Sequence, residues 1–216
     1  MKYLVVITAR KNSKRVPGKN ILKVGKKLLF EHTLDFAKKT LSKYPIYMST
    51  DCKIIKKICQ KKSILCPALR PEKLSDDNTR SADVLNYVLK YFEKFYYPVD
   101  AIILLQPTTP FRRKSDLKKS INLFEKNYTK YLSVVSVSNK KKKIIKFNLN
   151  KNNRLNTKCI ETSVPNGSIY IISSAKIKNT EIYGKNTYYS KIKGEKYNID
   201  IDSYVDLEKF KKYLPN

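Results

Sequence analysis

Short apolar runs alternate with amphipathic stretches along most of this 216-residue chain. The run at residues 4–7 is rich in β-branched side chains and predicts a buried parallel strand, and residues 101–105 predict another. Between them, residues 28–41 and 84–92 place apolar side chains at the spacing of a helix. This alternation of strands and helices predicts a three-layer α/β sandwich (αβα) with a mostly parallel, Rossmann-like sheet.

The remaining periodicities and caps complete the predicted order of elements. Further strands are predicted at residues 45–49, 132–137, 168–173 and 197–201, and further helices from residue 54, at residues 117–124 and after residue 203. Asp51 is predicted to cap the helix that begins near residue 54, and Asn78 or Thr79 to cap the helix that contains residues 84–92. Ser203 and Asp206 have the spacing of a capping box.

Residues 138–164 differ in character from the rest of the chain. Residues 140–143 are all lysine, residues 144–149 alternate as a strand does, and residues 150–158 are mostly polar. We interpret this stretch as an excursion from the core sheet, a hairpin arm that is poorly able to bury its own apolar residues. The whole chain, residues 1–216, is predicted to form one domain.

The net charge of +28 makes nucleic-acid binding the first function to weigh. Only seven of the 46 cationic residues are arginine, the residue that dominates base readout and bidentate phosphate contacts. The lysines are spread over the chain, mostly at polar helix positions such as Lys57, Lys119 and Lys212. We therefore expect solvated faces and no specific nucleic-acid partner, with a basic RNA-binding module as the rival function.

Cysteine and histidine usage argues against a structural zinc site. Cys52, Cys59, Cys66 and Cys159 form no CxxC pair, and His32 is the single histidine. A metal site would then consist of oxygen ligands, which favours Mg²⁺ or Mn²⁺. No apolar run approaches 18 residues, so we expect no membrane association and a cytoplasmic location.

A basic loop directly follows the first predicted strand. Its five cations are Arg10, Lys11, Lys14, Arg15 and Lys19. Because ligands of open α/β sheets bind beyond the carboxyl ends of the strands, this position suits a polyanion of the size of a nucleoside triphosphate. Neither GxGxxG nor GxxxxGK[ST] occurs, which leaves side-chain cations and loop amides to hold the phosphates. The alternative is a solvated basic loop.

The segment NIDID, residues 198–202, contains paired carboxylates. As a strand it would place Asn198, Asp200 and Asp202 on one face, and Ile199 and Ile201 on the other. Two carboxylates that lie roughly 7 Å apart along a strand repel each other unless a cation lies between or beside them. The segment therefore predicts a divalent-metal site, with two exposed aspartates before a helix as the alternative.

Five segments in a fixed order carry a resemblance to a known family: ITARKNSKRVPGKN, MSTD, LRPEKLSDDNTRSADV, LLQPTTPFR, and PNGSIY followed by DID. The chain resembles the acylneuraminate cytidylyltransferases, which activate sialic acid and related nine-carbon keto-acid sugars with CTP. The likeness runs from residue 3 to about residue 213 and is weakest at residues 138–163. It implies transfer of CMP to the anomeric hydroxyl of the sugar with release of pyrophosphate. It also implies Mg²⁺ or Mn²⁺ as cofactor, and a homodimer in which residues 138–164 clasp the partner.

The same resemblance assigns roles to residues of the matching segments. The catalytic residues would be Arg10, Lys19 and Asp202; the nucleotide-binding residues Ala9, Arg10, Asn12, Ser13, Lys19, Asn20, Arg70 and Ser81; the sugar-binding residues Gln106 and Asn166; and the metal ligands Asp200 and Asp202. Each assignment has a plainer alternative. Lys19 and Asn20 could close a turn, Arg70 could pair with a surface acid, and Gln106 could satisfy buried amides at a strand end.

Departures from the family pattern bear on the acceptor. Thr8 stands where many relatives have proline, Val164 where sialic-acid enzymes often have arginine, and Ser168 where alanine is usual. Gln106 is followed by Pro-Thr-Thr, which argues against the octulosonate branch, and the pattern Gln-Pro-Thr-x-Pro-x-Arg argues against the pseudaminate branch. We expect a sialate or legionaminate acceptor, with another sugar acid, of pseudaminate or octulosonate type, as the alternative.

Overall fold

The computed structural model describes the backbone of residues 1–149 and 155–214, and the side chains of residues 1–139 and 162–214. In chain order the elements are β1 (Tyr3–Thr8), η1 (Lys19–Ile21), β2 (Lys23–Val24), β3 (Lys27–Leu28), α1 (Leu29–Thr40), β4 (Ile46–Ser49), α2 (Lys53–Lys61), η2 (Glu72–Leu74), α3 (Ser81–Phe95), β5 (Ala101–Leu104), α4 (Lys114–Lys126), β6 (Ser133–Leu149), β7 (Leu155–Ser173), α5 (Ser174–Lys178), β8 (Thr187–Lys191), η3 (Glu195–Asn198) and α6 (Tyr204–Lys211). None of the described helices combines the length and the apolar character that crossing a membrane requires.

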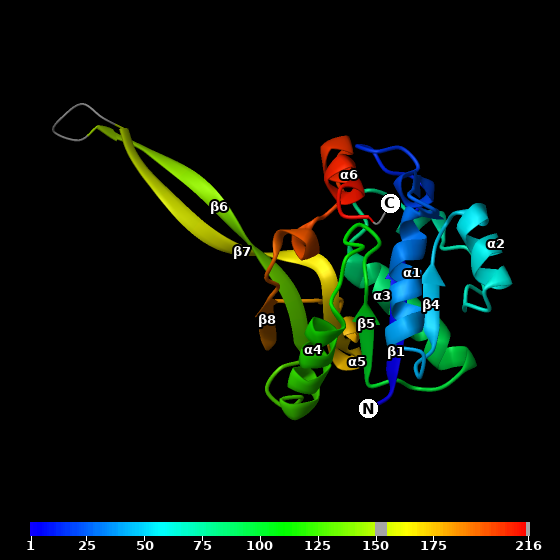
Figure 1. The fold of residues 1–216 in the computed structure, drawn as a ribbon. Helices are drawn as coiled ribbons and strands as arrows, with labels where there is room; N and C mark the ends of the chain where they lie inside the picture. The colour runs from blue at the N-terminus through cyan, green and yellow to red at the C-terminus, as the bar shows by residue number, and fades with distance from the viewer. Residues whose placement is uncertain (150–154, 215–216) are drawn as a thin grey trace.

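The central sheet has six strands in the order β4-β1-β5-β7-β6-β8. β1 pairs in parallel with β4 and β5, and β6 pairs in parallel with β8. β7 runs antiparallel to both of its neighbours, β5 and β6. The prediction of a mostly parallel sheet is confirmed, and β7 is the strand that makes it mixed (Figure 1).

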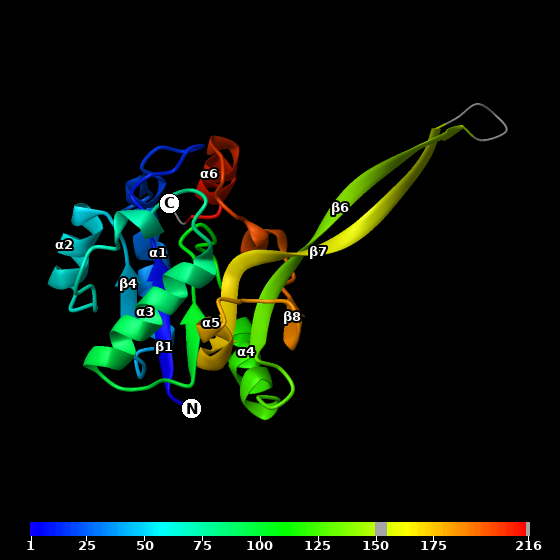
Figure 2. The same ribbon diagram turned by 180° about the vertical axis from the view of Figure 1, so that it is seen from behind.

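Helices cover both faces of the sheet, because successive residues of a strand point to opposite sides. Tyr3, Val5 and Ile7 of β1 pack with α1, α2 and α4 in one core cluster. Leu4 and Val6 pack with α3 and α5 in a second cluster on the other face. α1 and α4 lie in front in Figure 1, and α3 and α5 lie in front in Figure 2. The predicted three-layer sandwich is confirmed.

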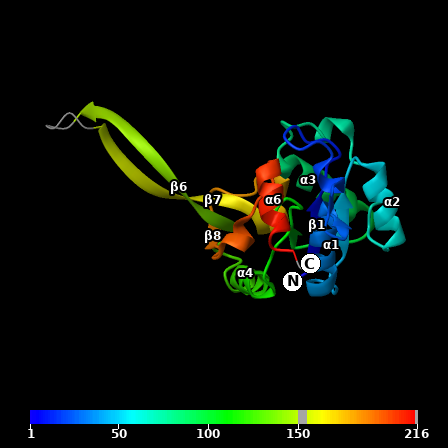
Figure 3. The ribbon, with the colours of Figure 1, turned by 45° about the horizontal axis from the view of Figure 1, so that its top comes forward.

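A third, smaller cluster fixes α6 to the body. Ile199 and Ile201 pack there with Leu207 and Phe210 of α6, and with Leu29 at the start of α1. Figures 1 and 3 show the result, with α6 beside the loop that follows β1. The packing brings the end of the chain to the carboxyl end of the first strand.

Two of the predicted helix caps are wrong. α2 begins at Lys53 with Cys52 at the N-cap, and the Asp51 carboxylate instead accepts a hydrogen bond from the Lys11 amide at 2.6 Å. α3 begins at Ser81 with Arg80 at the N-cap, so neither residue 78 nor residue 79 caps it. The partner of Asp51 lies 40 residues away in the chain, so the local sequence pattern around Asp51 could not reveal it. The Ser203 capping box with Asp206 is confirmed.

The predicted strand at residues 197–201 is also wrong. Residues 195–198 form the short 3-10 helix η3, and residues 199–202 belong to no helix or strand. The Asn198 side chain donates to the carbonyls of Ile192 and Gly194, and such local bonds favour a turn over a ladder. The predicted alternation of faces nevertheless holds, because Ile201 is fully buried while Asp200 is exposed.

Beyond the body, β6 and β7 continue as a two-stranded hairpin. Their backbone register runs from Asn139 opposite Ser163 to Leu149 opposite Leu155. Figures 1, 2 and 3 show this hairpin projecting away from the sheet. The described strand residues 139–149 and 155–163 therefore pair with each other outside the body. The lysines at 140–143 and the apolar residues at 144–149, on which the clasp prediction depends, lie outside the described side chains.

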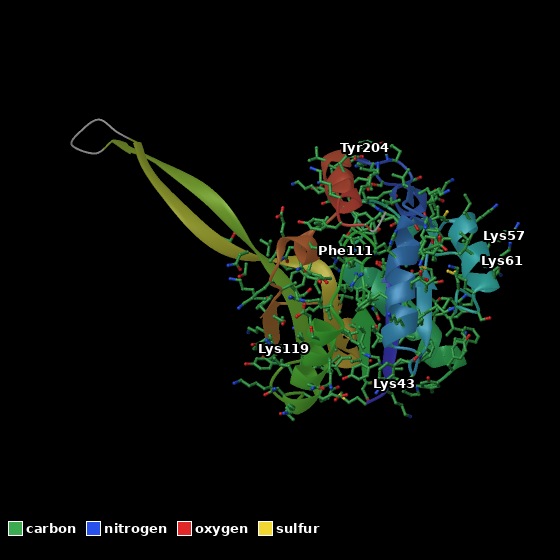
Figure 4. The ribbon with its side chains drawn as sticks, in the orientation of Figure 1. Lys43, Lys57, Lys61, Phe111, Lys119 and Tyr204 are labelled. Carbon is green, nitrogen blue, oxygen red and sulfur yellow. The ribbon has the colours of Figure 1, made fainter. Side chains whose placement is uncertain are left out.

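The lysines that we expect to be solvated lie on the outside of the body. Lys57, Lys119 and Lys212 are exposed. In Figure 4 the labelled Lys43, Lys57, Lys61 and Lys119 come from separate parts of the body, on α2, on α4 and after α1. The positive charge is thus distributed over several elements.

Candidate active site

A cavity of about 360 Å³ lies beyond the carboxyl ends of β1 and β5. We call it the nucleotide cavity. Most of the predicted site residues line it, namely Arg10, Ser13, Lys19, Asn20, Arg70, Ser81, Gln106, Asp200 and Asp202. They come from four parts of the chain, which the parallel strands and α6 bring to one edge of the sheet.

Three predicted residues lie elsewhere. Ala9 belongs to the hydrophobic core, and Asn12 is exposed beside the cavity lining. Asn166 is buried, and its amide is engaged within the protein. Its Oδ1 accepts from the Ser136 hydroxyl at 2.6 Å, and its Nδ2 donates to the Asn198 side chain at 3.1 Å. In this structure Asn166 fastens β7 to β6 and η3.

The cationic end of the nucleotide cavity is built by the turn at Gly18, which has a positive φ of 62° that glycine adopts without strain. Lys19 follows, with a side chain that is only 9% exposed. Its Nζ donates to the Ile201 carbonyl at 2.6 Å and lies 3.2 Å from Asp202 Oδ1. Arg15 Nη2 lies 2.9 Å from the other Asp202 oxygen. Two cations of the basic loop therefore hold the second carboxylate of the NIDID segment.

The loop after η2 carries an acid into the same basic site. Asp77 forms an ion pair with Arg10 and a second one with Lys14 at 3.0 Å. The pKa of Asp77 lies below its usual value because Lys14 donates a hydrogen bond to the carboxylate and Arg10 adds its charge. Asp77 is part of the matching segments, but the sequence interpretation gave it no role. The signal that could have revealed it is the acidic pair at residues 76–77 in a very basic chain.

Two residues that line the nucleotide cavity have buried polar atoms with unmet hydrogen bonds. Within the described part of the chain, Asn20 Oδ1 and Arg70 Nη2 are buried and have no hydrogen-bond partner. Burial lowers the pKa of Arg70, and the Asp51 carboxylate 3.7 Å away partly offsets this. Buried polar groups are normally paired, so an unmet acceptor and an unmet donor on residues that line one cavity fit the polar edge of a ligand.

Gln106 lies where the nucleotide cavity meets a second cavity of about 560 Å³. Both cavities share Gln106 and Ser81, and Tyr170 and Tyr183 line the second one. The Gln106 side chain lies so close to Gly167 that a Cβ on that glycine would be 2.3 Å from Gln106 Oε1. The glycine of PNGSIY is therefore required by the position of the glutamine side chain.

The donor set at Asp200 and Asp202 fits a divalent metal bound together with a triphosphate. Among the described residues, no group of three or more His, Cys, Asp or Glu side chains is arranged to hold a metal ion. Cys52, Cys59 and Cys66 are buried free thiols. Mg²⁺ is commonly held by one or two carboxylates that act together with substrate phosphates and water. Two aspartates at the wall of a cationic cavity match that mode.

Comparison with known proteins decides the family. A family model described as Cytidylyltransferase matches residues 4–213. The chain belongs to the cytidylyltransferase family. The resemblance carried by the five sequence segments is thereby confirmed, and the chain is a nucleotidyltransferase.

Two curated relatives match nearly the whole chain. The CMP-N,N'-diacetyllegionaminic acid synthase of Legionella pneumophila is 31% identical over 221 residues, covering 95% of this chain and 93% of the relative. The N-acylneuraminate cytidylyltransferase of Escherichia coli O18:K1:H7 is 27% identical over 219 residues, covering 96% of this chain. The chain spans 51% of that longer relative.

A solved structure has the same fold as this cytidylyltransferase chain. A CMP:2-keto-3-deoxy-manno-octonic acid synthetase in complex with CTP aligns with a TM-score of 0.67. The alignment covers 98% of each chain at 16% sequence identity. At that identity the match establishes the α/β architecture.

Proposed function

We propose that this protein transfers CMP from CTP to the anomeric hydroxyl of a nonulosonic acid, of the legionaminic or sialic acid type, and releases pyrophosphate. One observation carries the proposal: a single cavity holds the cations Arg10 and Lys19, the aspartates of the NIDID segment, and the unmet polar atoms of Asn20 and Arg70. Support for the acceptor comes from the legionaminic acid synthase, which matches 95% of the chain.

In this proposal the anomeric oxygen attacks the α-phosphorus of CTP in line with the bond to the leaving pyrophosphate. A new P–O bond to the sugar forms, the bond between the α-phosphorus and the bridging oxygen breaks so that pyrophosphate leaves, and the hydroxyl proton passes to solvent water. Arg10 and Lys19 offset the charge that develops on the pyrophosphate. Asn20, Arg70 and Ser81 bind the cytidine, and Gln106 faces the sugar. The acceleration then comes mostly from positioning and electrostatics.

Asp200 and Asp202 are proposed to hold Mg²⁺ or Mn²⁺ with the triphosphate. When bound, the ion supplies positive charge that offsets the repulsion between a polyanionic nucleotide and an acidic sugar. Lys19 keeps Asp202 oriented toward the cavity, since it contacts both the carboxylate and the adjacent Ile201 carbonyl.

The test is pyrophosphate release from CTP and Mg²⁺ with a panel of sugar acids. We expect release with N,N'-diacetyllegionaminic acid or N-acetylneuraminic acid, and a CTP-dependent rise in thermal stability. Release with pseudaminic acid or an octulosonate alone would instead support the alternative acceptors. Folded protein that releases no pyrophosphate with any member of the panel would overturn the proposal. Tight, salt-sensitive RNA binding without a thermal shift from CTP would favour the RNA-binding rival.

We further propose that the chain is a single domain that forms a homodimer in the cytoplasm, where CTP is available. The paired strand residues 139–149 and 155–163 extend beyond the body, and two strands alone are marginally stable in water. Such an arm gains stability by packing on a second copy. Light scattering at micromolar concentration tests this, and a monomer would contradict it.

A further inference from the structure

Arg112 is a buried cation that the proposed reaction does not use directly. It follows β5, lies just before α4 and is 8% exposed. Among the described side chains, no carboxylate pairs with its guanidinium, and burial lowers the pKa of Arg112 with no acid to offset it. Burying a charge without an opposite charge is unfavourable unless hydrogen bonds compensate it. An arginine at such a position therefore needs partners that are fixed in place.

The partners of Arg112 are oxygens from three separate segments. Nε donates to the Ser168 carbonyl at 2.6 Å, and Nη2 donates to the Gln106 carbonyl at 2.6 Å. Nη1 donates to the Thr33 hydroxyl of α1 at 2.9 Å, and Nη2 also reaches the Thr109 hydroxyl at 3.3 Å. The planar fork of the guanidinium thus joins α1, the loop after β5 and β7 at one point.

One of these oxygens belongs to Gln106, which lies at the junction of the two cavities. Gln106 lines both of them, and its backbone amide donates to the Gly167 carbonyl at 3.2 Å. Ser168 is the next residue along β7. Arg112 therefore joins the Gln106 backbone to β7, while the absence of a side chain at Gly167 leaves room for the glutamine amide.

We infer that Arg112 is a positioning residue of the acceptor site, which acts by fixing Gln106 at the junction of the two cavities. The inference rests on the proposed function, since it concerns the sugar acid that Gln106 faces. Arg112 lines neither cavity, so it acts on the substrate through Gln106. Asn20 and Arg70, which are proposed to bind the cytidine, take part in none of the Arg112 hydrogen bonds.

Arg112→Lys is the informative substitution, because it keeps the positive charge and loses the fork. One ammonium group cannot reproduce the two parallel bonds to the carbonyls of residues 106 and 168. We expect kcat/KM for N,N'-diacetyllegionaminic acid to fall about 10²-fold, the loss typical of a misplaced group. The KM for CTP and the CTP-induced thermal shift should stay within a few-fold of the wild-type values.

A double-mutant cycle separates this role from a general loss of structure. If Arg112 acts through Gln106, then Arg112→Lys adds little to the loss that Gln106→Ala already causes. The inference is overturned if the two substitutions lower kcat/KM independently, so that their losses multiply in the double variant. It is also overturned if Arg112→Lys raises the KM for CTP by as much as it lowers kcat/KM for the acceptor. Either result would leave the proposed function intact. A wild-type protein without any turnover would overturn both.

Thr33→Val provides a second route if Arg112→Lys does not fold. The substitution is nearly isosteric in α1 and removes one acceptor of the guanidinium without touching either cavity. We expect a smaller loss of kcat/KM for the same acceptor, again absent in the Gln106→Ala background. A change in the KM for CTP, without a loss of kcat/KM for the acceptor, would count against the inference.

Discussion

Lys19 Nζ lies 3.2 Å from Asp202 Oδ1, although 183 residues separate the two in the chain. The contact joins the basic loop after β1 to the segment before α6, and Arg15 strengthens it from the solvent side at 2.9 Å. Both cations offset the negative charge of Asp202. The same three side chains are those that a triphosphate and a divalent ion would rearrange.

Asp202→Asn should remove most of the turnover. The amide keeps the shape of the carboxylate but loses the charge that a divalent ion requires. We expect normal folding, weaker CTP binding in Mg²⁺, and a fall in kcat of about 10²-fold or more. Steady-state kinetics and CTP titration with and without Mg²⁺ measure this.

Asp206→Asn is the matched control for Asp202→Asn, four residues along. Asp206 accepts hydrogen bonds from the Ser203 hydroxyl at 2.7 Å and from the Ser203 amide at 3.0 Å. The substitution should lower the free energy of unfolding by about 0.5–1 kcal/mol, as loss of a cap does, and leave turnover nearly intact. If both variants keep kcat within a few-fold of wild type, the metal assignment is wrong.

The same cap predicts a pH dependence of stability. Burial alone would raise the pKa of Asp206, but hydrogen bonds from Ser203 and from the Asp202 amide outweigh it and lower the pKa. A lowered carboxyl pKa stabilises the fold above the unfolded-state value, and the contribution disappears as pH falls through the folded-state value. The Tm difference between wild type and Asp206→Asn should therefore shrink as pH falls from 7 to below about 4. A constant difference would contradict it.

Asp77→Asn should tighten CTP binding. Asp77 pairs with Arg10 and Lys14, and because Arg10 is proposed to bind the triphosphate, Asp77 would compete with the nucleotide for that cation. Removing this competing anion should lower the Kd for CTP about two- to fivefold, the range of one exposed ion pair. Isothermal titration measures the Kd. Asp83→Asn, which removes an ion pair with Arg80 on the surface of α3, should leave it unchanged.

Gly167→Ala should impair the acceptor step more than CTP binding. The new methyl group would lie 2.3 Å from Gln106 Oε1, and the backbone φ of 73° is unfavourable for alanine. We expect a loss of stability of about 1–3 kcal/mol and a drop in kcat/KM for the sugar acid. Gly184 also has a positive φ, of 113°, and a Cβ added there would meet no atom within 4 Å. Gly184→Ala therefore isolates the backbone effect. An equal loss in both variants would show that the Gln106 contact is unimportant.

Local patterns in the sequence predicted most of the fold. The β-branched run of β1 and the helical stripe of α1 depend on periodicity, which neighbouring residues alone set. The Ser203 capping box is equally local, since its partners are three residues apart. The motif segments also pointed to Arg10, Lys19, Arg70 and the aspartates, because their order is specific to a family.

The tertiary structure decided the partners of the polar side chains. Asp51 binds the Lys11 amide instead of capping α2, and the amide of Asn166, a predicted sugar-binding residue, hydrogen-bonds to Ser136 and Asn198 within the protein. In the sequence Arg112 is the last residue of a motif, and in the structure it is buried and donates a hydrogen bond to the Gln106 carbonyl. Such partners lie far apart in the chain, and their distances are fixed only when the sheet and its helices pack. The sequence by itself therefore determined the elements and the chemistry available, whereas packing determined which polar groups the protein uses internally and which it leaves for a ligand.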